Sequence, residues 1–343
     1  MKNYLIKQPK NYIIGIFLII FLQVVPVAFA DGIIIDHTCT DLNRIPDYWL
    51  EQAKNLTLHY AHTSHGSQII SGISNLETLY PKYSVAIRES SAAGLPAVES
   101  PPALRIYDGN PPETYITPDD YWQGESGKNR TRAVVNTGDY NFSMWSWCSQ
   151  ADSSESYIQE YLDTMAQFEV EYPNMRFIYI TGHLNGTGSS GNLHIRNEQI
   201  RDYCRTNDKV LFDFADIERY DPDGTDYLDL AGTDSCGYSS GNWAEEWCAA
   251  NPDSDLCDSC SCSHSRALNC NVKARAFWWM MARLAGWNPE GTPVANFSGA
   301  PAAGTVPLEV TFTDASTGEI AGWSWDFDNN GTEDSTEQNP THT

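Results

Sequence analysis

The sequence predicts an α/β protein in which a five-stranded parallel sheet is flanked by helices, followed by a small, incomplete β-sandwich. Two observations predict this fold. Strand-like and helix-like segments alternate along most of the chain, an order typical of parallel sheets covered on both faces. From Val294 onward, apolar and polar residues instead alternate between turns, with no helical pattern, as in small β-sandwiches.

The N-terminal segment, residues 1–30, has the pattern of a cleavable signal peptide. Three lysines and no acid precede an apolar run that ends in the small-x-small sequence Ala28-Phe29-Ala30. The apolar run is short for a membrane span, which needs about 20 residues. We therefore expect cleavage rather than an uncleaved anchor, no membrane association afterwards, and a secreted, cell-surface or periplasmic protein.

Charge and cysteine content agree with an exported chain. The formal net charge is −24 and becomes −27 once the three lysines of the signal segment are removed, so we expect no nucleic-acid partner. Exported cysteines usually pair as disulfides. Six of the nine lie between Cys236 and Cys270, which predicts a stapled, irregular loop there. The odd total leaves at least one cysteine outside such pairs, and spacing does not define the connectivity.

The larger domain is predicted to span residues 31–288. Buried or alternating apolar runs predict strands over residues 55–61, 83–87, 141–147, 176–181 and 210–214. Helical spacing of apolar residues predicts helices over residues 68–80, 154–171, 193–205 and 272–284. Residues 95–140, rich in Pro and Tyr, are interpreted as a long insertion whose Trp122 would suit the stacking of a carbohydrate.

The remaining residues, 289–343, form the predicted β-sandwich. The helical pattern stops at an Asn-Pro-Glu-Gly segment, and strict alternation follows in Leu308–Phe312. The segment Trp323-Ser324-Trp325-Asp326-Phe327-Asp328 and the closing Asn339-Pro340-Thr341-His342-Thr343 resemble a PKD domain, an immunoglobulin-like module of exported proteins. The resemblance implies a further turn and strand after residue 343, so we interpret the module as truncated, with one sheet edge unpaired.

Acidic residues of this module have the spacing of a calcium loop. Asp326, Asp328 and Asn330 supply side-chain oxygens at alternate positions, as calcium loops do. The alternative is a polar hairpin turn with Asn-Gly at its tip. Apart from this possible calcium ion, no cofactor is expected.

Polar and glycine residues follow every predicted strand of the larger domain. Because ligands bind outside the carboxyl ends of parallel strands, we expect a site at this edge of the sheet. The segments are His62–Ser67, Ser90–Gly94, Trp147–Gln150, Thr181–Gly186 and Asp213–Asp216, with Cys262–Ser265 before the last helix.

This order resembles the SGNH hydrolases, also called GDSL-like esterases, over roughly residues 55–286. The resemblance implies a flavodoxin-like sheet, Ser64 as nucleophile and His264 as base. It also implies Gly94 and Gln150 as oxyanion donors. The serine block nevertheless reads His-Thr-Ser-His-Gly instead of Gly-Asp-Ser, and Gln150 stands where the family has asparagine. Ser261 occupies the position of the family's acid, so a Ser–His dyad or a different acid is left open.

The function expected from these residues is that of an exported serine-type hydrolase that cleaves an ester, such as an acyl group on a carbohydrate. A serine hydroxyl becomes nucleophilic when a neighbouring imidazole takes its proton. The partner is then a carbohydrate or an acylated small molecule, and His65, His183 and Asn185 are candidate binding residues. The alternative is a non-catalytic exported glycan-binding or surface protein in which the PKD-like module is a spacer.

Two other interpretations use the histidines and cysteines as metal ligands. A metal-dependent hydrolase would need three or four converging groups, drawn from His59, His62, His65, His183 and His194. The spacing Cys257-x-x-Cys260-x-Cys262-x-His264 is similar to a zinc knuckle, although disulfides are the expected state in an exported chain. A glycosidase would need two facing carboxylates, and no pair of acids stands out in the sequence.

Overall fold

The structure is a computed structural model that describes residues 32–289, 294–318, 320, 322–328 and 332–343. The predicted signal peptide, residues 1–30, and Asn330 of the predicted calcium loop lie outside the described residues. Within the described residues, no helix combines the length and apolar character that crossing a membrane requires.

The larger domain is built on one parallel sheet, which confirms the predicted α/β class. The sheet has seven strands instead of the five predicted, in the order β1-β7-β6-β5-β2-β4-β3. The strands are β1 (Ile33–Ile35), β2 (Thr57–His62), β3 (Val85–Glu89), β4 (Leu104–Asp108), β5 (Phe142–Ser146), β6 (Arg176–Ile180) and β7 (Val210–Phe212). The two strands that the sequence analysis missed are β1, which has only three residues, and β4.

Strand β4 corrects the interpretation of residues 95–140 as an insertion. It lies between β2 and β3, with Leu58 opposite Ile106, so it is an interior strand of the sheet, next to the edge strand β3. The indole of Trp122 is fully buried and packs against Trp145 and Trp147, with ring centroids 5.9 Å and 5.6 Å away. Trp122 is therefore a core residue, and the predicted role in stacking a carbohydrate is wrong.

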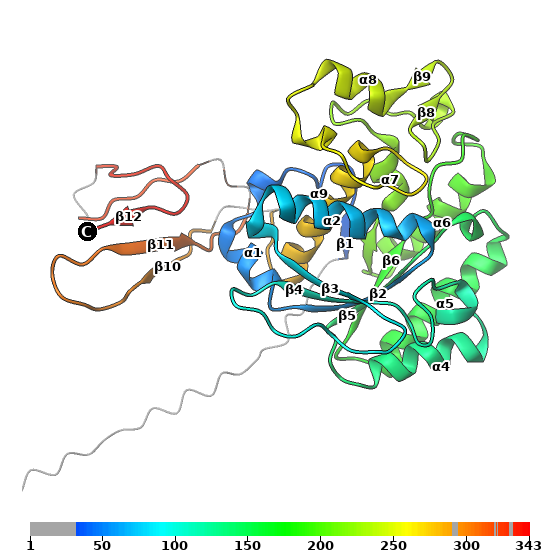
Figure 1. Cartoon of the computed structure of the whole chain (residues 1–343), viewed down its shortest axis with the longest axis horizontal. Coiled ribbons are helices and arrows are strands. Elements are labelled where there is room, and N and C mark those ends of the chain that lie inside the picture. The colour runs from blue at the N-terminus through cyan, green and yellow to red at the C-terminus, as the bar shows by residue number, and fades with distance from the viewer. Residues whose placement is uncertain (1–31, 290–293, 319, 321, 329–331) are drawn as a thin grey trace, which may run out of the picture.

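Helices cover both faces of the sheet (Figure 1). They are α1 (Asp47–Ala53), α2 (Ser67–Leu79), α3 (Pro118–Tyr121), α4 (Gly124–Val135), α5 (Glu155–Glu171), α6 (Asn192–Thr206), α7 (Phe214–Arg219), α8 (Trp243–Ala250) and α9 (Ala267–Leu284). Single helical turns are η1 (Leu42–Arg44), η2 (Ser64–Gly66), η3 (Pro81–Tyr83), η4 (Ser149–Ala151), η5 (Leu228–Leu230) and η6 (Asp255–Cys257). Helix α9 packs along α2 and is almost entirely buried.

The chain reverses direction across the sheet between β2 and β5. From β2 it proceeds to the β3 edge, and from β5 it proceeds through β6 and β7 the other way. Because crossover connections are right-handed, α2 lies on one face and α5 and α6 on the other. The carboxyl ends of β2 and β5 therefore form a switch point, the place where doubly wound sheets bind ligands.

A buried ion pair lies beneath this edge of the sheet. Lys273 Nζ on α9 donates to Glu218 Oε1 at 2.7 Å, and both side chains are fully buried. Lys273 also donates to Gln68 on α2. The second oxygen of Glu218 accepts the Leu184 amide at 2.8 Å. The pair thus joins α2, α7, α9 and the loop that follows β6.

The C-terminal residues form a separate antiparallel sheet of three strands (Figure 1). They are β10 (Phe297–Ala300), β11 (Val310–Asp314) and β12 (Thr341–His342), beside an aromatic cluster of Phe297, Phe312, Trp325 and Phe327. This sheet contacts α1, where Trp49 Nε1 donates to the Ser316 carbonyl at 3.4 Å. Ligand oxygens of Asp326, Asp328 and Asp334 lie within 4.8 Å of one another. Calcium binding there stays a prediction.

Two disulfides confirm that the cysteine-rich loop is stapled. Cys248 pairs with Cys257, and Cys262 pairs with Cys270. The loop also contains the short hairpin of β8 (Gly237–Tyr238) and β9 (Gly241–Asn242). Because Cys257 and Cys262 are both in disulfides, the zinc-knuckle interpretation is wrong. Five cysteines are free, and two of these, Cys148 and Cys260, are partly exposed.

Candidate active site

Ser64 lies at the first residue of the turn η2, directly after β2. Thr63 keeps an extended backbone and Ser64 begins the helical turn that continues into α2. A glycine is required at position 66, since a Cβ there would lie 2.3 Å from the Cβ of His62. The Tyr60 hydroxyl donates to the Gly66 carbonyl at 2.9 Å and fixes the turn. The serine is thereby held at the switch point with its side chain partly exposed.

His264 reaches Ser64 from a position 200 residues later in the chain. Its Nε2 lies 2.8 Å from Ser64 Oγ, a hydrogen-bonding distance. The histidine lies in the loop that the Cys262–Cys270 disulfide closes. Its φ of 64° is a left-handed conformation that costs free energy in a residue other than glycine and is often found at functional sites. The sequence analysis paired these two residues, and the structure brings them into contact.

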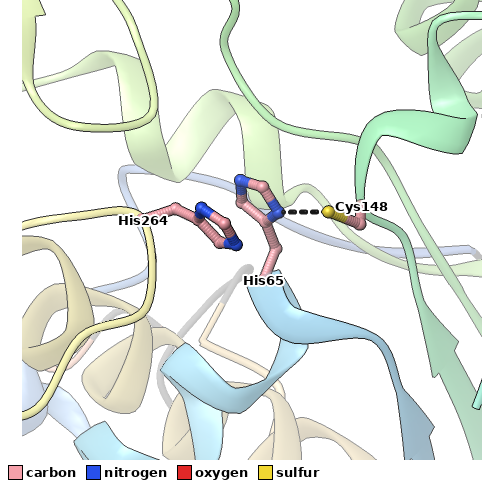
Figure 2. A group of neighbouring side chains, drawn as sticks. All are labelled: His65, Cys148 and His264. Atoms are coloured by element: carbon pink, nitrogen blue, oxygen red, sulfur yellow. Dashed lines mark hydrogen bonds between the residues drawn. The ribbon is translucent and has the colours of Figure 1, made fainter. Parts of the chain in front are cut away.

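Cys148 is a second nucleophilic side chain at the same point. It follows β5, and its Sγ lies 3.3 Å from Ser64 Oγ and 3.0 Å from His65 Nδ1 (Figure 2). The other ring nitrogen of His65, Nε2, lies 3.0 Å from Asp234 Oδ2. Because a carboxylate accepts hydrogen bonds only, Nε2 carries a proton, and in neutral His65 the Nδ1 lone pair faces the thiol. Cys148, His65 and Asp234 therefore form a continuous chain of hydrogen bonds.

Three imidazole rings are stacked in this site. The ring of His65 lies between those of His183 and His264, with centroids 4.2 Å and 4.4 Å away and interplanar angles of 9° and 11°. Burial alone would lower the pKa of His65, but its hydrogen bonds to Asp234 and Cys148 raise that pKa to about 9. Burial and the nearby charge of His65 lower the pKa of His183. Of His65 and His183, His65 is thus the ring that is positively charged at neutral pH.

The Cys148 thiol is activated by its neighbours. Burial alone would raise its pKa, but hydrogen bonds with His65 and Ser64 lower the pKa to about 7. A large fraction of Cys148 is then thiolate at neutral pH, and the thiolate is the nucleophilic form of cysteine. Cys260 is also free and partly exposed, and burial without such a partner raises its pKa to about 11.

Of the two predicted oxyanion donors, Gln150 lies at the site and Gly94 does not. Gln150, in η4, accepts the Cys148 amide on Oε1 at 2.9 Å, which places its carboxamide beside the site. Gly94 follows the edge strand β3, and its carbonyl accepts a hydrogen bond from Arg88 at 2.7 Å. Strand β4 separates β3 from β2, so the structure does not bring Gly94 to Ser64. The glycine after β4 is Gly109, whose amide donates to the Tyr60 carbonyl at 3.0 Å.

Of the three candidate binding residues, two lie in the site and one does not. His65 and His183 belong to the imidazole stack, and the buried Nε2 of His183 has no hydrogen-bond partner among the described residues. Asn185 instead donates to Asp152 at 3.1 Å and accepts from Thr187, so its side chain holds the loop. The other histidines of the predicted metal site lie elsewhere: His59 bonds Gly109, His62 bonds Asp108 and His194 pairs with Glu198.

The sequence analysis did not identify Cys148 and Asp234 as site residues. Cys148 had two signals, its place after a predicted strand and the odd number of cysteines. Asp234 lies 169 residues from His65, in a loop without a motif, and no signal pointed to it. Within the described residues no carboxylate hydrogen-bonds to His264. Asp255, one of the two acids nearest in sequence, is bound by Arg275 and Tyr80.

The same cluster has donor atoms that suit a metal ion. Ligand atoms of His65, Cys148 and His264 lie within 4.8 Å of one another, as do those of His65, His183 and Asp234. However, a ligand set must converge on one point about 2.0–2.3 Å from every donor atom. The rings of His65 and His264 are nearly parallel and stacked, so their in-plane lone pairs lie in separate planes and do not converge on one point. This arrangement fits a stack of imidazole rings better than a metal coordination sphere.

The chain has no recognisable relatives in the comparisons with known proteins. No family of proteins, no curated protein and no solved structure matches it. The assignment of function therefore depends on the geometry of the site.

The Cys262–Cys270 disulfide is expected to position His264. Closing a loop of this length stabilises a protein by about 2.5 kcal/mol on chain-entropy grounds. Cys262→Ser should therefore lower the midpoint of thermal unfolding and, while the chain is still folded, slow any reaction that needs the Ser64–His264 contact. The matched control is Cys248→Ser, which opens a loop of similar length that does not contain His264. Equal losses of reactivity in both variants would contradict this role.

Proposed function

We propose that this protein is an exported serine-type hydrolase that cleaves an ester, with an acylated carbohydrate or small molecule as substrate. The observation that carries the proposal is the 2.8 Å separation between Ser64 Oγ and His264 Nε2 at the switch point of the sheet. The two disulfides and the acidic composition support an extracellular setting.

Each group of the pair has a definite task. The Ser64 oxygen attacks the ester carbonyl carbon while His264 Nε2 takes the hydroxyl proton, and His264 then returns that proton to the departing alcohol. Water hydrolyses the resulting acyl-serine in the same manner. His264 is an exposed base with no carboxylate bonded to it within the described residues, so the unit is a Ser–His dyad.

The negative oxygen of the tetrahedral intermediate needs hydrogen-bond donors. The Ser64 amide is one candidate, because the first amide of a helical turn has no carbonyl one turn earlier to bond. The Gln150 carboxamide is the other, because its Oε1 is occupied by the Cys148 amide and its NH₂ group is left to donate. Removing one such donor typically costs about 2.7–4 kcal/mol of barrier.

The order of the site segments supports an SGNH-like ancestry within the proposal. In that family the serine follows the first strand and opens a helix, and a histidine precedes the last helix. Ser64 follows β2, the first strand predicted from the sequence, and leads into α2, while His264 precedes α9. The departure is that β1 comes before β2 in the chain. The small C-terminal sheet is then a PKD-like spacer. The alternative of a non-catalytic glycan binder would not require the contact between Ser64 and His264, and the buried Trp122 offers neither function a stacking surface.

The proposal is tested by labelling the purified chain with a fluorophosphonate, which reacts with serines activated by a base. We expect one label, on Ser64, and none in Ser64→Ala. His264→Gln should slow the labelling about 10²–10⁴-fold, the usual contribution of a general base. Ser91→Ala, at an exposed serine after β3, is the control and should label normally. Absence of label in the wild-type chain would refute the proposal.

A further inference from the structure

We propose that Cys148, His65 and Asp234 form a second catalytic triad in this site, in which Cys148 takes an acyl group from an ester or thioester. The inference rests on the proposed acyl chemistry, but not on Ser64 as the nucleophile. It adds a thiol-dependent activity whose residues are distinct from the Ser64–His264 dyad.

The geometry follows the order nucleophile, base and orienting acid. His65 Nδ1 lies 3.0 Å from Cys148 Sγ, and His65 Nε2 lies 3.0 Å from Asp234 Oδ2, so the imidazole bridges thiol and carboxylate through opposite nitrogens. Cysteine hydrolases on unrelated folds use this constellation, and it is recognised by geometry and role rather than by sequence position. The three residues come from η2, the end of β5 and the loop before β8.

The surroundings of the three residues suit a thiolate. The His65 ring is almost fully buried, between the rings of His183 and His264, so it has one orientation available. Asp234 is partly buried, and although burial raises its pKa, its hydrogen bond to His65 lowers it, so it stays ionised. Cys148 itself is partly exposed, as a group that meets a substrate must be.

Cys148 and Ser64 are also close enough to act on the same bound substrate. Their side-chain atoms are 3.3 Å apart, so one bound acyl group lies within reach of both. The Gln150 carboxamide, anchored on the Cys148 amide, can face the oxyanion formed by either nucleophile. A structural role alone would not require a free thiol in an exported, disulfide-bonded domain to contact an imidazole that is itself bonded to a carboxylate.

The proposed step is balanced without an oxidant or a cofactor. The Cys148 thiolate attacks the carbonyl carbon, the carbon–sulfur bond forms and the bond to the leaving oxygen or sulfur breaks. The Nδ1 proton of protonated His65 passes to the leaving group, which departs as an alcohol or a thiol. Water then cleaves the thioester to the carboxylic acid and the free thiol.

The first arm of the test measures alkylation by iodoacetamide at pH 6, with peptide mapping of each cysteine. Cys260 is the control within the same chain. We expect Cys148 to react about a hundredfold faster, because its larger thiolate fraction outweighs the lower nucleophilicity of a low-pKa thiolate. The rate at Cys148 should rise to half its maximum near pH 7. Equal rates at Cys148 and Cys260 would overturn the proposal.

Variants test the roles of the two partners. His65→Gln should slow alkylation of Cys148 about tenfold at pH 6 and leave Cys260 unchanged. Asp234→Asn should move the midpoint of the pH profile upward, because loss of the carboxylate lowers the pKa of His65 and weakens its charge. Asp234→Asn also serves where His65→Gln does not fold. A profile that neither variant moves would contradict the triad.

The second arm measures acyl transfer in Ser64→Ala, so that the serine cannot contribute. After incubation with p-nitrophenyl acetate, we expect an acetyl group on the Cys148 peptide that neutral hydroxylamine removes, and none in Ser64→Ala/His65→Gln. Failure of Ser64→Ala both to acquire acetyl on Cys148 and to release nitrophenolate, or acetylation that does not depend on His65, would overturn the inference. Fluorophosphonate labelling of Ser64 is read separately, so failure of this inference and failure of the proposed function are distinguishable.

Discussion

In a Cys148→Ala background, Ser64→Ala is expected to reduce kcat/KM for a short-chain p-nitrophenyl ester at least about a thousandfold, the scale seen when a hydrolase loses its nucleophile. The physical reason is that His264 would then have no hydroxyl to deprotonate. The chain should keep its fold, because Ser64 is partly exposed and its side chain contacts the site residues Cys148 and His264 instead of the core. Steady-state hydrolysis followed by nitrophenolate absorbance measures the effect.

The control for this experiment is Cys148→Ala, which leaves Ser64 and His264 in place. If Ser64 is the main nucleophile, Cys148→Ala should keep most of the ester hydrolysis. Near-normal hydrolysis by Ser64→Ala together with loss in Cys148→Ala would contradict the serine mechanism and assign the reaction to the thiol. Loss of turnover in Ser64→Ala with persistence of a stable acetyl-Cys148 adduct would show that both nucleophiles react and only the serine turns over.

Glu218→Ala is expected to destabilise the protein by about 3–5 kcal/mol, because it leaves the charge of Lys273 buried without a partner. The same change removes the acceptor of the Leu184 amide, which also lies in the interior. The free energy of unfolding from urea titration measures the loss. The variant should also lower reactivity at the site, since Glu218 supports the loop that carries His183.

Two further variants serve as controls for the prediction on Glu218→Ala. Asp202→Ala removes an exposed ion pair with Arg205 on α6, at 3.6 Å, and should change the free energy of unfolding by less than about 1 kcal/mol. The double variant Glu218→Ala/Lys273→Met removes both buried charges and should recover much of the stability. A loss in Glu218→Ala no larger than that in Asp202→Ala would show that the pair contributes little.

The sequence was sufficient to predict the parts of the fold with strong local signals. Apolar runs marked β5, β6 and β7, and helical spacing marked α2, α5 and α6 close to their observed ends. Helix α9 was also predicted, but from residue 272 instead of its observed start at Ala267. The strand and helix predictions required only periodicity. The pairing of Ser64 with His264 instead came from the resemblance to the SGNH hydrolases, and the structure brings the two side chains into contact.

The missed features depend on long-range pairing. Strand β4 has five residues in a Pro-rich region, and only its position between β2 and β3 makes it a strand. Gly94 was assigned to the site through the SGNH resemblance, as the glycine after the second predicted strand, but β4 separates that strand, β3, from β2. Asp234 lies in an irregular loop, where two backbone contacts, its amide with Leu184 and the bridge between Thr233 and Asn185, fix its position, and no periodic pattern encodes such contacts.

The loop that carries His264 has a consequence for where the dyad can act. The Cys262–Cys270 bond closes that loop, so His264 is held against Ser64 only after the two cysteines have been oxidised to a disulfide. A chain still in a reducing environment would hold its serine without a fixed base, in a latent form similar to a zymogen that oxidation rather than proteolysis matures. Esterase activity would then appear together with disulfide formation, after the chain has left the compartment in which it was synthesised.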